Sequence, residues 1–144
     1  MNINYDDVHW HYNNSFPKEL GADHARTHIA IFLGWAISRG LEGETLKSTY
    51  PEKLENFRKG VINSKVILSD CCDDKITNDD LSDLGNSFAS AYYESMYLDD
   101  YVDRSDDDLP SIYYEPYTDK KIDEICKLLD NRYQEWHAGQ RFTR

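Results

Sequence analysis

One segment is apolar around most of a helical circumference, and it limits the possible folds more than any other part of the chain. Residues 22 to 39 form two adjacent stripes at helical spacing: Ala25, Ile29, Phe32, Leu33 and Ala36, then His24, His28, Ile31 and Trp35. A helix apolar on two sides has to be covered by neighbours, so we expect it at the centre of the fold. Asp23 can cap its start, and Arg39-Gly40 is typical of a helix end.

The remaining strip of this helix is small throughout. It consists of Thr27, Ala30, Gly34 and Ser38. Small residues let a neighbouring backbone approach closely, but they are also found on lightly packed outer faces. The sequence leaves both interpretations open.

The rest of the chain predicts shorter helices. Between residues 44 and 70 the apolar spacing fits one or two of them, with Pro51 in a first turn and Gly60 as a break. The sequence Thr77-Asn78-Asp79-Asp80 is typical of a helix N-terminus, which predicts a helix from there to about residue 100. Residues 112–114 are a candidate short strand, and a last helix should begin near Thr118 and end before Gly139.

These elements predict a mainly α fold. The 144 residues are enough for one domain, and 40% of them are hydrophobic, which is enough for a core. We expect a single two-layer helical domain over residues 1–144, with about five helices around the one that contains Trp35 and room for one short strand pair. Its ordered core should span residues 5–136, followed by a basic tail at 137–144.

Negative charge is concentrated in one segment. The chain has 27 acidic against 16 basic residues, and residues 70–124 contain 17 of the acids with only four bases. Affinity for nucleic acids and for anionic membranes depends on cations, so this charge disfavours both and favours a basic protein partner. Such a block is either solubilising surface or a docking face.

Tyrosine accompanies aspartate in this segment, and the combination favours a binding face. Seven of the 11 tyrosines lie between residues 92 and 117. Tyrosine is common at binding hot spots, and clustered carboxylates attract basic partners, although some of these rings could instead cap the core. The candidate partner-binding residues are Tyr93, Tyr97, Asp99, Asp100, Tyr101, Asp103, Asp106, Asp107, Asp108, Tyr113 and Tyr114.

Histidine provides the only signal for a metal. His24 and His28 are four residues apart on one helical face, and His9 and His11 could add further ligands. The H-E-x-x-H form of a zinc protease fails because Ala25 replaces the glutamate, so a structural role for the histidines competes with metal binding. The sequence has no G-x-S-x-G, phosphate loop or dinucleotide fingerprint, and we expect neither catalysis nor a cofactor.

The N-terminus and the cysteines suggest a compartment. The first residues have no cationic stretch before an apolar run, and the longest apolar stretch, residues 29–37, is about half of what a membrane span needs. Cys71, Cys72 and Cys126 fit neither a disulfide framework nor a zinc knuckle, so we expect them to be reduced and to pack. We therefore predict a cytoplasmic protein.

Several motifs are spread along most of the chain: Asp7-Val8-His9-Trp10-His11-Tyr12, Phe16-Pro17, Ala25-x-Thr27-His28-Ile29-x-x-Phe32-Leu33-x-Trp35, Gly40-Leu41, Asp73-x-Lys75-Ile76, Gly85-Asn86-x-Phe88-Ala89 and Tyr92-Tyr93-x-x-x-Tyr97-x-Asp99-Asp100-Tyr101. Together they resemble a family of small bacterial domains of unknown function whose members often lie beside polymorphic-toxin genes. Asp74 departs from the glycine expected in the turn at 73–75. The resemblance implies an immunity protein that is cytoplasmic, without catalytic activity, and acidic where its toxin is a basic nuclease.

Three hypotheses follow for the function. The first is an immunity or inhibitor protein whose acidic, tyrosine-rich face covers the active site of a basic toxin, with a nuclease as the expected target. The second is a metal-binding module or metal-dependent hydrolase that uses His9, His11, His24 and His28. The third is an adaptor that uses the acidic face without any toxin.

Overall fold

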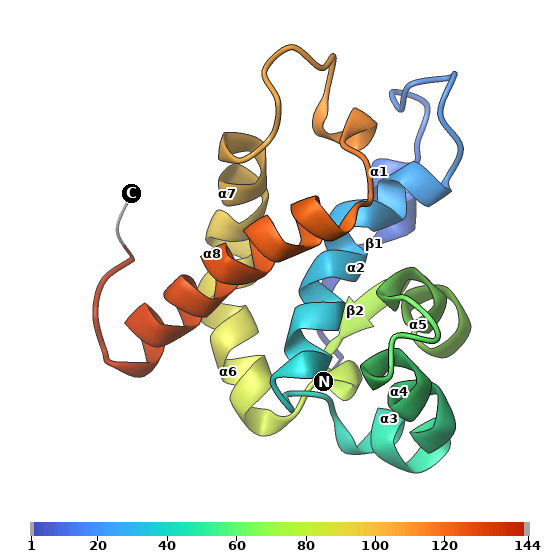
Figure 1. Cartoon of the computed structure of the whole chain (residues 1–144). Coiled ribbons are helices and arrows are strands. Elements are labelled where there is room, and N and C mark those ends of the chain that lie inside the picture. Colours follow the sequence, from blue (N-terminus) through green and yellow to red (C-terminus); the bar gives the residue numbers. More distant parts are fainter. Residues whose placement is uncertain (1, 143–144) are drawn as a thin grey trace.

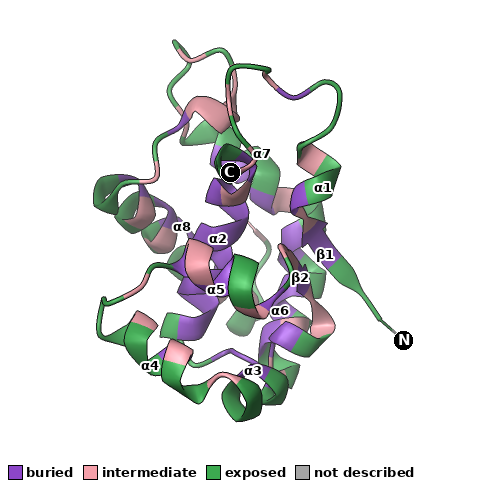
Figure 2. Cartoon of the chain, turned by 90° about the vertical axis from the view of Figure 1, so that its right-hand side faces the viewer, coloured by how far each residue is buried: buried purple, intermediate pink, exposed green. Residues whose placement is uncertain are grey.

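The computed structural model describes residues 2–142 and is built around one buried helix. Helix α2 (Asp23–Ser38) lies at the centre, and residues 25 and 27–37 of it are buried (Figure 2). Its N-cap is Ala22 and not Asp23, which lies in the first turn and binds Lys65 and Arg26. Gly40, with φ of 75°, ends the helix as predicted.

The small strip of α2 is a site of close packing. Helices α3 (Glu44–Thr49), α4 (Pro51–Arg58) and α5 (Ser64–Cys71) follow it, with Pro51 in the first turn of α4. A Cβ atom on Gly34 would lie 2.9 Å from Cβ of Ser64 on α5. The absence of a side chain at Gly34 is therefore what lets α5 approach.

A short antiparallel sheet joins the N-terminus to the middle of the chain. Strand β1 (Asn4–Asp7) pairs with β2 (Lys75–Thr77), with Asp6 opposite Ile76, and helix α1 (Val8–His11) follows β1. This is the strand pair for which the sequence left room, but it does not involve residues 112–114. That segment is the 3₁₀ turn η3 (Ile112–Tyr114), so its prediction as a strand was wrong.

The long helix predicted from Thr77 is divided into several elements. Thr77 caps a 3₁₀ turn, η1 (Asn78–Asp80), and Ser82 caps the helix α6 (Asp83–Tyr92). A turn of π-helix, η2 (Tyr93–Tyr97), then leads into α7 (Leu98–Asp103). The capping signal at Thr77 was correct, but it belongs to the turn before the helix.

Helix α8 (Asp119–His137) crosses α2 and packs against α6 (Figure 1). Thr118 caps it as predicted, Ile125, Leu128 and Leu129 on its apolar face are buried, and Gly139 lies just beyond its end with φ of 73°. The indole of Trp35 donates to Asp130 of α8 at 2.9 Å. The fold is thus mainly α, as the sequence predicted. The end of the predicted tail, residues 143–144, lies outside the described residues.

Neither a membrane span nor a disulfide occurs in the part of the chain that the structure describes. Within residues 2–142, no helix combines the length and the apolar character needed to cross a membrane. All three cysteines are free, and Cys72 is buried. Burial raises the pKa of Cys126 to about 11 and that of Cys72 further, so both thiols are protonated near neutral pH.

Candidate functional site

The tyrosines predicted to form a binding face are in the core. Tyr93, Tyr97 and Tyr101 are only 5%, 1% and 0% exposed. Their rings pack around α2, where Tyr97 lies 5.4 Å from Phe32 between ring centroids. The assignment of these three tyrosines to a partner-binding surface was therefore wrong, because a partner could not reach them.

The π turn explains why Tyr97 and Tyr101 point into the core. A π turn holds one more residue than an α turn, which rotates everything after it by about 100° around the helix axis. Up to Tyr92 the buried positions follow α-helical spacing, but beyond the π turn they shift by one residue. Tyr97 is buried as a result, whereas Met96, four residues after Tyr92, is only partly buried.

Asp100 was also assigned to the binding face, and it too is buried. Its carboxylate accepts two hydrogen bonds from Arg132 of α8, at 2.9 and 3.0 Å, and one from the hydroxyl of Tyr92 at 2.6 Å. Burial raises the pKa of Tyr92, and the Asp100 carboxylate adds to that effect. This group fixes α7 and α6 to α8 inside the protein.

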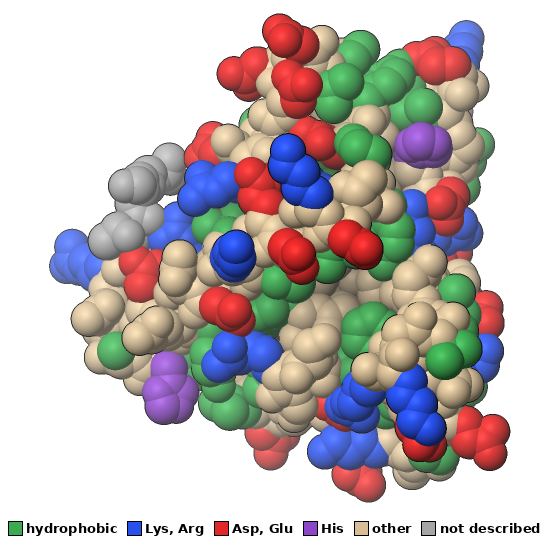
Figure 3. All heavy atoms as spheres, in the orientation of Figure 1, with side chains coloured by type: hydrophobic (Ala, Val, Ile, Leu, Met, Phe, Trp, Pro, Cys, Tyr) green, Lys and Arg blue, Asp and Glu red, His purple; other side chains and the backbone are tan. Residues whose placement is uncertain are grey.

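Of the six aspartates in the predicted binding face, five have exposed side chains, and we call them the acidic surface: Asp99, Asp103, Asp106, Asp107 and Asp108. They come from α7 and from the loop that follows it, which projects at the top of Figure 3, where red side chains gather. Some other acids of the segment have basic partners, such as Asp74 with Arg26, while others, such as Asp79, Asp83 and Asp123, are exposed and more widely spread. Among residues 2–142, none of the five forms an ion pair with a basic side chain, so their charge is uncompensated.

The loop of the acidic surface is held by a buried ion pair that sequence reasoning missed. Glu115 and Lys121 are 7% and 5% exposed, and their charged atoms lie 3.7 Å apart. Glu115 accepts from the backbone N–H of Asp106 at 2.5 Å, while the ammonium of Lys121 donates to the carbonyl of Arg104 at 2.7 Å. Within the loop, Asp106 Oδ1 accepts from the N–H of Asp108. These bonds fix the loop at its base.

Apolar side chains adjoin the acidic surface on α7. Leu98 and Val102 lie one turn apart and are 43% and 47% exposed, and Asp99 and Asp103 form the neighbouring stripe. Asp99 and Asp103 also line a cleft of about 200 Å³ between α7 and α8. Tyr113 and Tyr114, the remaining tyrosines of the predicted face, are partly buried in η3.

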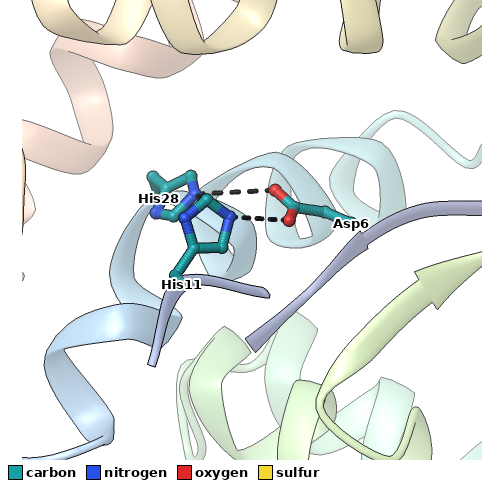
Figure 4. A group of neighbouring side chains, drawn as sticks. All are labelled: Asp6, His11 and His28. Carbon is teal, nitrogen blue, oxygen red and sulfur yellow. Dashed lines mark hydrogen bonds and ion pairs between the residues drawn. The ribbon is translucent and has the colours of Figure 1, made fainter. Parts of the chain in front are cut away.

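A second group of functional side chains meets where β1, α1 and α2 come together (Figure 4). His11 Nε2 lies 2.7 Å from Asp6 Oδ1, and His28 Nε2 lies 3.3 Å from His11 Nε2 and 3.5 Å from Asp6 Oδ2. We call these three residues the Asp-His-His cluster. It is mostly buried, with side-chain exposures of 8% for Asp6, 13% for His11 and 2% for His28.

Hydrogen bonds from outside orient each member of this cluster. Asp6 accepts from the N–H of Asp7 at 2.8 Å and from the hydroxyl of Tyr93 at 2.5 Å. His11 Nδ1 lies 2.7 Å from the hydroxyl of Tyr113. Burial alone would raise the pKa of Asp6, but hydrogen bonds from His11 and His28 outweigh it and lower that pKa. Burial lowers the pKa of His28, which favours its neutral form.

Two of the four histidines proposed as metal ligands lie elsewhere. The side chain of His9 is 80% exposed, and its Nδ1 lies 3.0 Å from Oδ1 of Asp7. His24 is exposed too, and its ring lies 3.2 Å from the carbonyl oxygen of Tyr113. His24 and His28, four residues apart, therefore belong to different environments, and the structure groups His28 with His11 and Asp6 instead.

Comparison with known proteins identifies a family. A model of a domain of unknown function, DUF7832, matches residues 4–115, which is most of the chain. The chain belongs to this family. No curated protein and no solved structure matches it significantly.

The DUF7832 match includes both groups of candidate residues. The Asp-His-His cluster and the acidic surface lie within residues 4–115, but α8 lies outside them. Lys121 and Arg132, which hold the acidic loop and Asp100, are on that helix. Structural support for the DUF7832 region thus comes from a helix beyond its matched boundary.

Proposed function

We propose that this chain is an immunity or inhibitor protein that binds a basic toxin through the acidic surface and covers its active site. The observation that carries the proposal is the set of five uncompensated carboxylates on α7 and on the fixed loop after it. The formal net charge of −11 favours the same kind of partner. The resemblance to domains found beside polymorphic-toxin genes supports the immunity role.

The charge pattern suits a nuclease as the target. A nuclease binds the phosphates of its substrate with cationic side chains, and a fixed array of carboxylates can occupy the same groove. Asp106, Asp107 and Asp108 are consecutive and exposed, so they offer several negative charges within a short length of chain. Electrostatic attraction between these carboxylates and a cationic groove speeds the encounter between inhibitor and enzyme.

The fixed loop adds affinity because it is ordered before binding. A flexible acidic loop would lose conformational entropy when it docks, whereas this one is already held by Glu115 and Lys121. Leu98 and Val102 supply apolar area beside the charges, and Tyr114, which is partly exposed in η3, remains an aromatic candidate in place of the buried tyrosines. The contact surface is therefore smaller and more acidic than the sequence suggested.

Capture and inhibition together test the role. The purified chain, used as bait in lysate of its own species, should retain one basic protein at low salt and release much of it in about 0.5 M salt, where exposed charges are screened. The captured protein should degrade nucleic acid, and a stoichiometric amount of this chain should stop that activity. A captured enzyme whose activity is unchanged, or no basic partner at all, would refute the proposal.

Replacing Asp106, Asp107 and Asp108 with asparagine should slow association with that toxin by about tenfold or more at low salt. The substitution keeps side-chain size but removes three charges, so the dependence of the rate on salt should also become flatter. Stopped-flow or surface-binding kinetics at two ionic strengths would measure both effects.

A matched variant tests whether the position of the removed charges matters, and not only their number. Glu44, Glu52 and Glu55 are exposed on α3 and α4, away from the acidic surface, and their replacement by glutamine changes the net charge equally. This control should alter the association rate by less than about twofold, because its charges are far from the docking site on the scale of screening. Equal effects of the two triple variants would mean that the loop is not at the interface.

A further inference from the structure

We propose that Asp6, His11 and His28 form a binding site for one divalent transition-metal ion of the Zn²⁺ class. The inference is independent of the toxin-binding role, because the cluster is buried and uses none of the five residues of the acidic surface. It differs from the histidine set suggested by the sequence in that it includes a carboxylate and leaves out His9 and His24.

The spacing of the three groups fits a tetrahedral ion. Bonds of about 2.0–2.1 Å at tetrahedral angles place neighbouring ligand atoms about 3.3 Å apart. The distance between His28 Nε2 and His11 Nε2 is 3.3 Å, and that between His28 Nε2 and Asp6 Oδ2 is 3.5 Å. The third separation, 2.7 Å between His11 Nε2 and Asp6 Oδ1, is that of a hydrogen bond and would lengthen when a metal replaces the proton.

The donor atoms of the cluster converge on the carboxylate of Asp6. Nε2 of His11 lies 2.7 Å from Oδ1 and Nε2 of His28 lies 3.5 Å from Oδ2, and the two nitrogens are 3.3 Å apart. Without a cation, both nitrogens face the carboxylate as N–H groups. A cation bound between the two nitrogens and the carboxylate replaces these protons, which are released to solvent, and each nitrogen then donates a lone pair.

The surrounding hydrogen bonds are those that a metal site requires. With a metal on Nε2, the Nδ1–H of His11 can donate to the oxygen of Tyr113, 2.7 Å away, which fixes the ring. Asp6 is oriented by the N–H of Asp7 and by the hydroxyl of Tyr93.

The ligand set and its burial define the role of the ion. Two imidazoles and one carboxylate suit Zn²⁺, whereas Mg²⁺ and Ca²⁺ prefer oxygen ligands only. The three ligands come from β1, α1 and α2, so the ion would tie the N-terminal segment to the central helix. Because the cluster is mostly buried and joins three elements, we assign the ion a structural role.

Metal titration of the whole chain tests the site. The protein, prepared without a histidine tag and stripped with chelator, should bind about one equivalent of added Zn²⁺, and its Tm should rise by about 5 °C at saturation. Added Co²⁺ should give the visible absorption of a tetrahedral site. Neither Mg²⁺ nor Ca²⁺ should change Tm.

Substitutions then locate the site. His11→Gln should weaken Zn²⁺ binding by more than about 100-fold, since even outer hydrogen-bond partners of metal ligands contribute about 10–100-fold. Asp6→Asn, which keeps the shape of the side chain, provides a second variant if His11→Gln does not fold by circular dichroism. The matched controls are His9→Gln and His24→Gln, which should bind Zn²⁺ like the unaltered chain.

Several results would overturn the assignment. Binding of less than about 0.1 equivalent of Zn²⁺ would do so, and so would undiminished binding by the folded His11→Gln and Asp6→Asn variants. Loss of binding in His9→Gln or His24→Gln would place the metal elsewhere. The test does not measure toxin inhibition, so a negative result for Zn²⁺ binding leaves the proposed function unaffected.

Discussion

Replacing Arg132 with methionine should lower the free energy of unfolding by about 3–5 kcal/mol. Arg132 is 6% exposed and donates two hydrogen bonds to the equally buried carboxylate of Asp100. Methionine fills similar space but leaves this carboxylate in the interior with Tyr92 as its remaining side-chain donor. Urea denaturation of both proteins would measure the difference.

Two comparisons make this prediction specific. The double variant Arg132→Met with Asp100→Asn should recover a substantial part of the loss, because Asp100 no longer leaves a buried charge, although Glu135, which pairs with Arg132 at 3.1 Å, still loses this ion pair. Arg39→Met breaks an ion pair with Asp130 that is about half exposed, and it should cost at most about 1 kcal/mol. If Arg132→Met were no worse than Arg39→Met, Asp100 would have to be hydrated in solution, and the interpretation of Asp100 as an exposed binding residue would regain support.

Tyr97→Ala should destabilise the protein by about 3–5 kcal/mol, the range for removal of a large buried aromatic side chain. The ring of Tyr97 is stacked on Tyr93 at 4.9 Å and packs edge-on to Phe32, so its loss leaves a cavity beside α2. Its hydroxyl also donates to the carbonyl oxygen of His28. Thermal or chemical unfolding would report the loss.

The size of the effect distinguishes a core residue from a binding residue. Tyr97→Phe keeps the ring and should cost only about 1 kcal/mol for the hydrogen bond. Tyr114→Ala, in the partly exposed turn η3, should change stability far less than Tyr97→Ala. A stable Tyr97→Ala variant that no longer bound its partner would contradict the burial described above and restore the tyrosine stripe to the interface.

Elements whose ends are marked by local chemistry were predictable from the sequence. Gly40 ends α2, Pro51 begins α4, and Thr118 caps α8, each at the expected place. These signals depend on a few neighbouring residues, so they can be read without knowledge of the fold. The central position of α2 was predictable for a related reason, since a helix apolar on two sides has to be covered.

Features that depend on distant residues were not predictable. Strand β1 pairs with β2 some seventy residues later in the chain, and neither short segment shows a clear alternation of its own. The sequence predicted Asp100 to be a surface acid, because its partner Arg132 lies 32 residues further along the chain. The Asp-His-His cluster likewise required the positions of β1, α1 and α2, although Asp6 and His11 are only five residues apart.

The acidic surface combines a feature that the sequence predicted with one that it did not. The excess of aspartate after residue 98 was evident from composition, and the structure leaves five of these side chains exposed. The order of the loop was not evident, because the pair that fixes it, Glu115 and Lys121, lies outside the aspartate run. Charge can thus be read from composition, while the rigidity that makes it useful for binding depends on tertiary contacts.

The π turn at Tyr93–Tyr97 has a consequence for how relatives of this chain would align with it. A π turn is a single-residue insertion absorbed into a helix without breaking it. A relative with uninterrupted α-helix here would lack one residue between positions 92 and 97, and the tyrosines on either side would match only across a one-residue gap. Deletion of a single exposed residue of this turn, such as Ser95, would rotate α7 by about 100° and turn Tyr97 and Tyr101 out of the core.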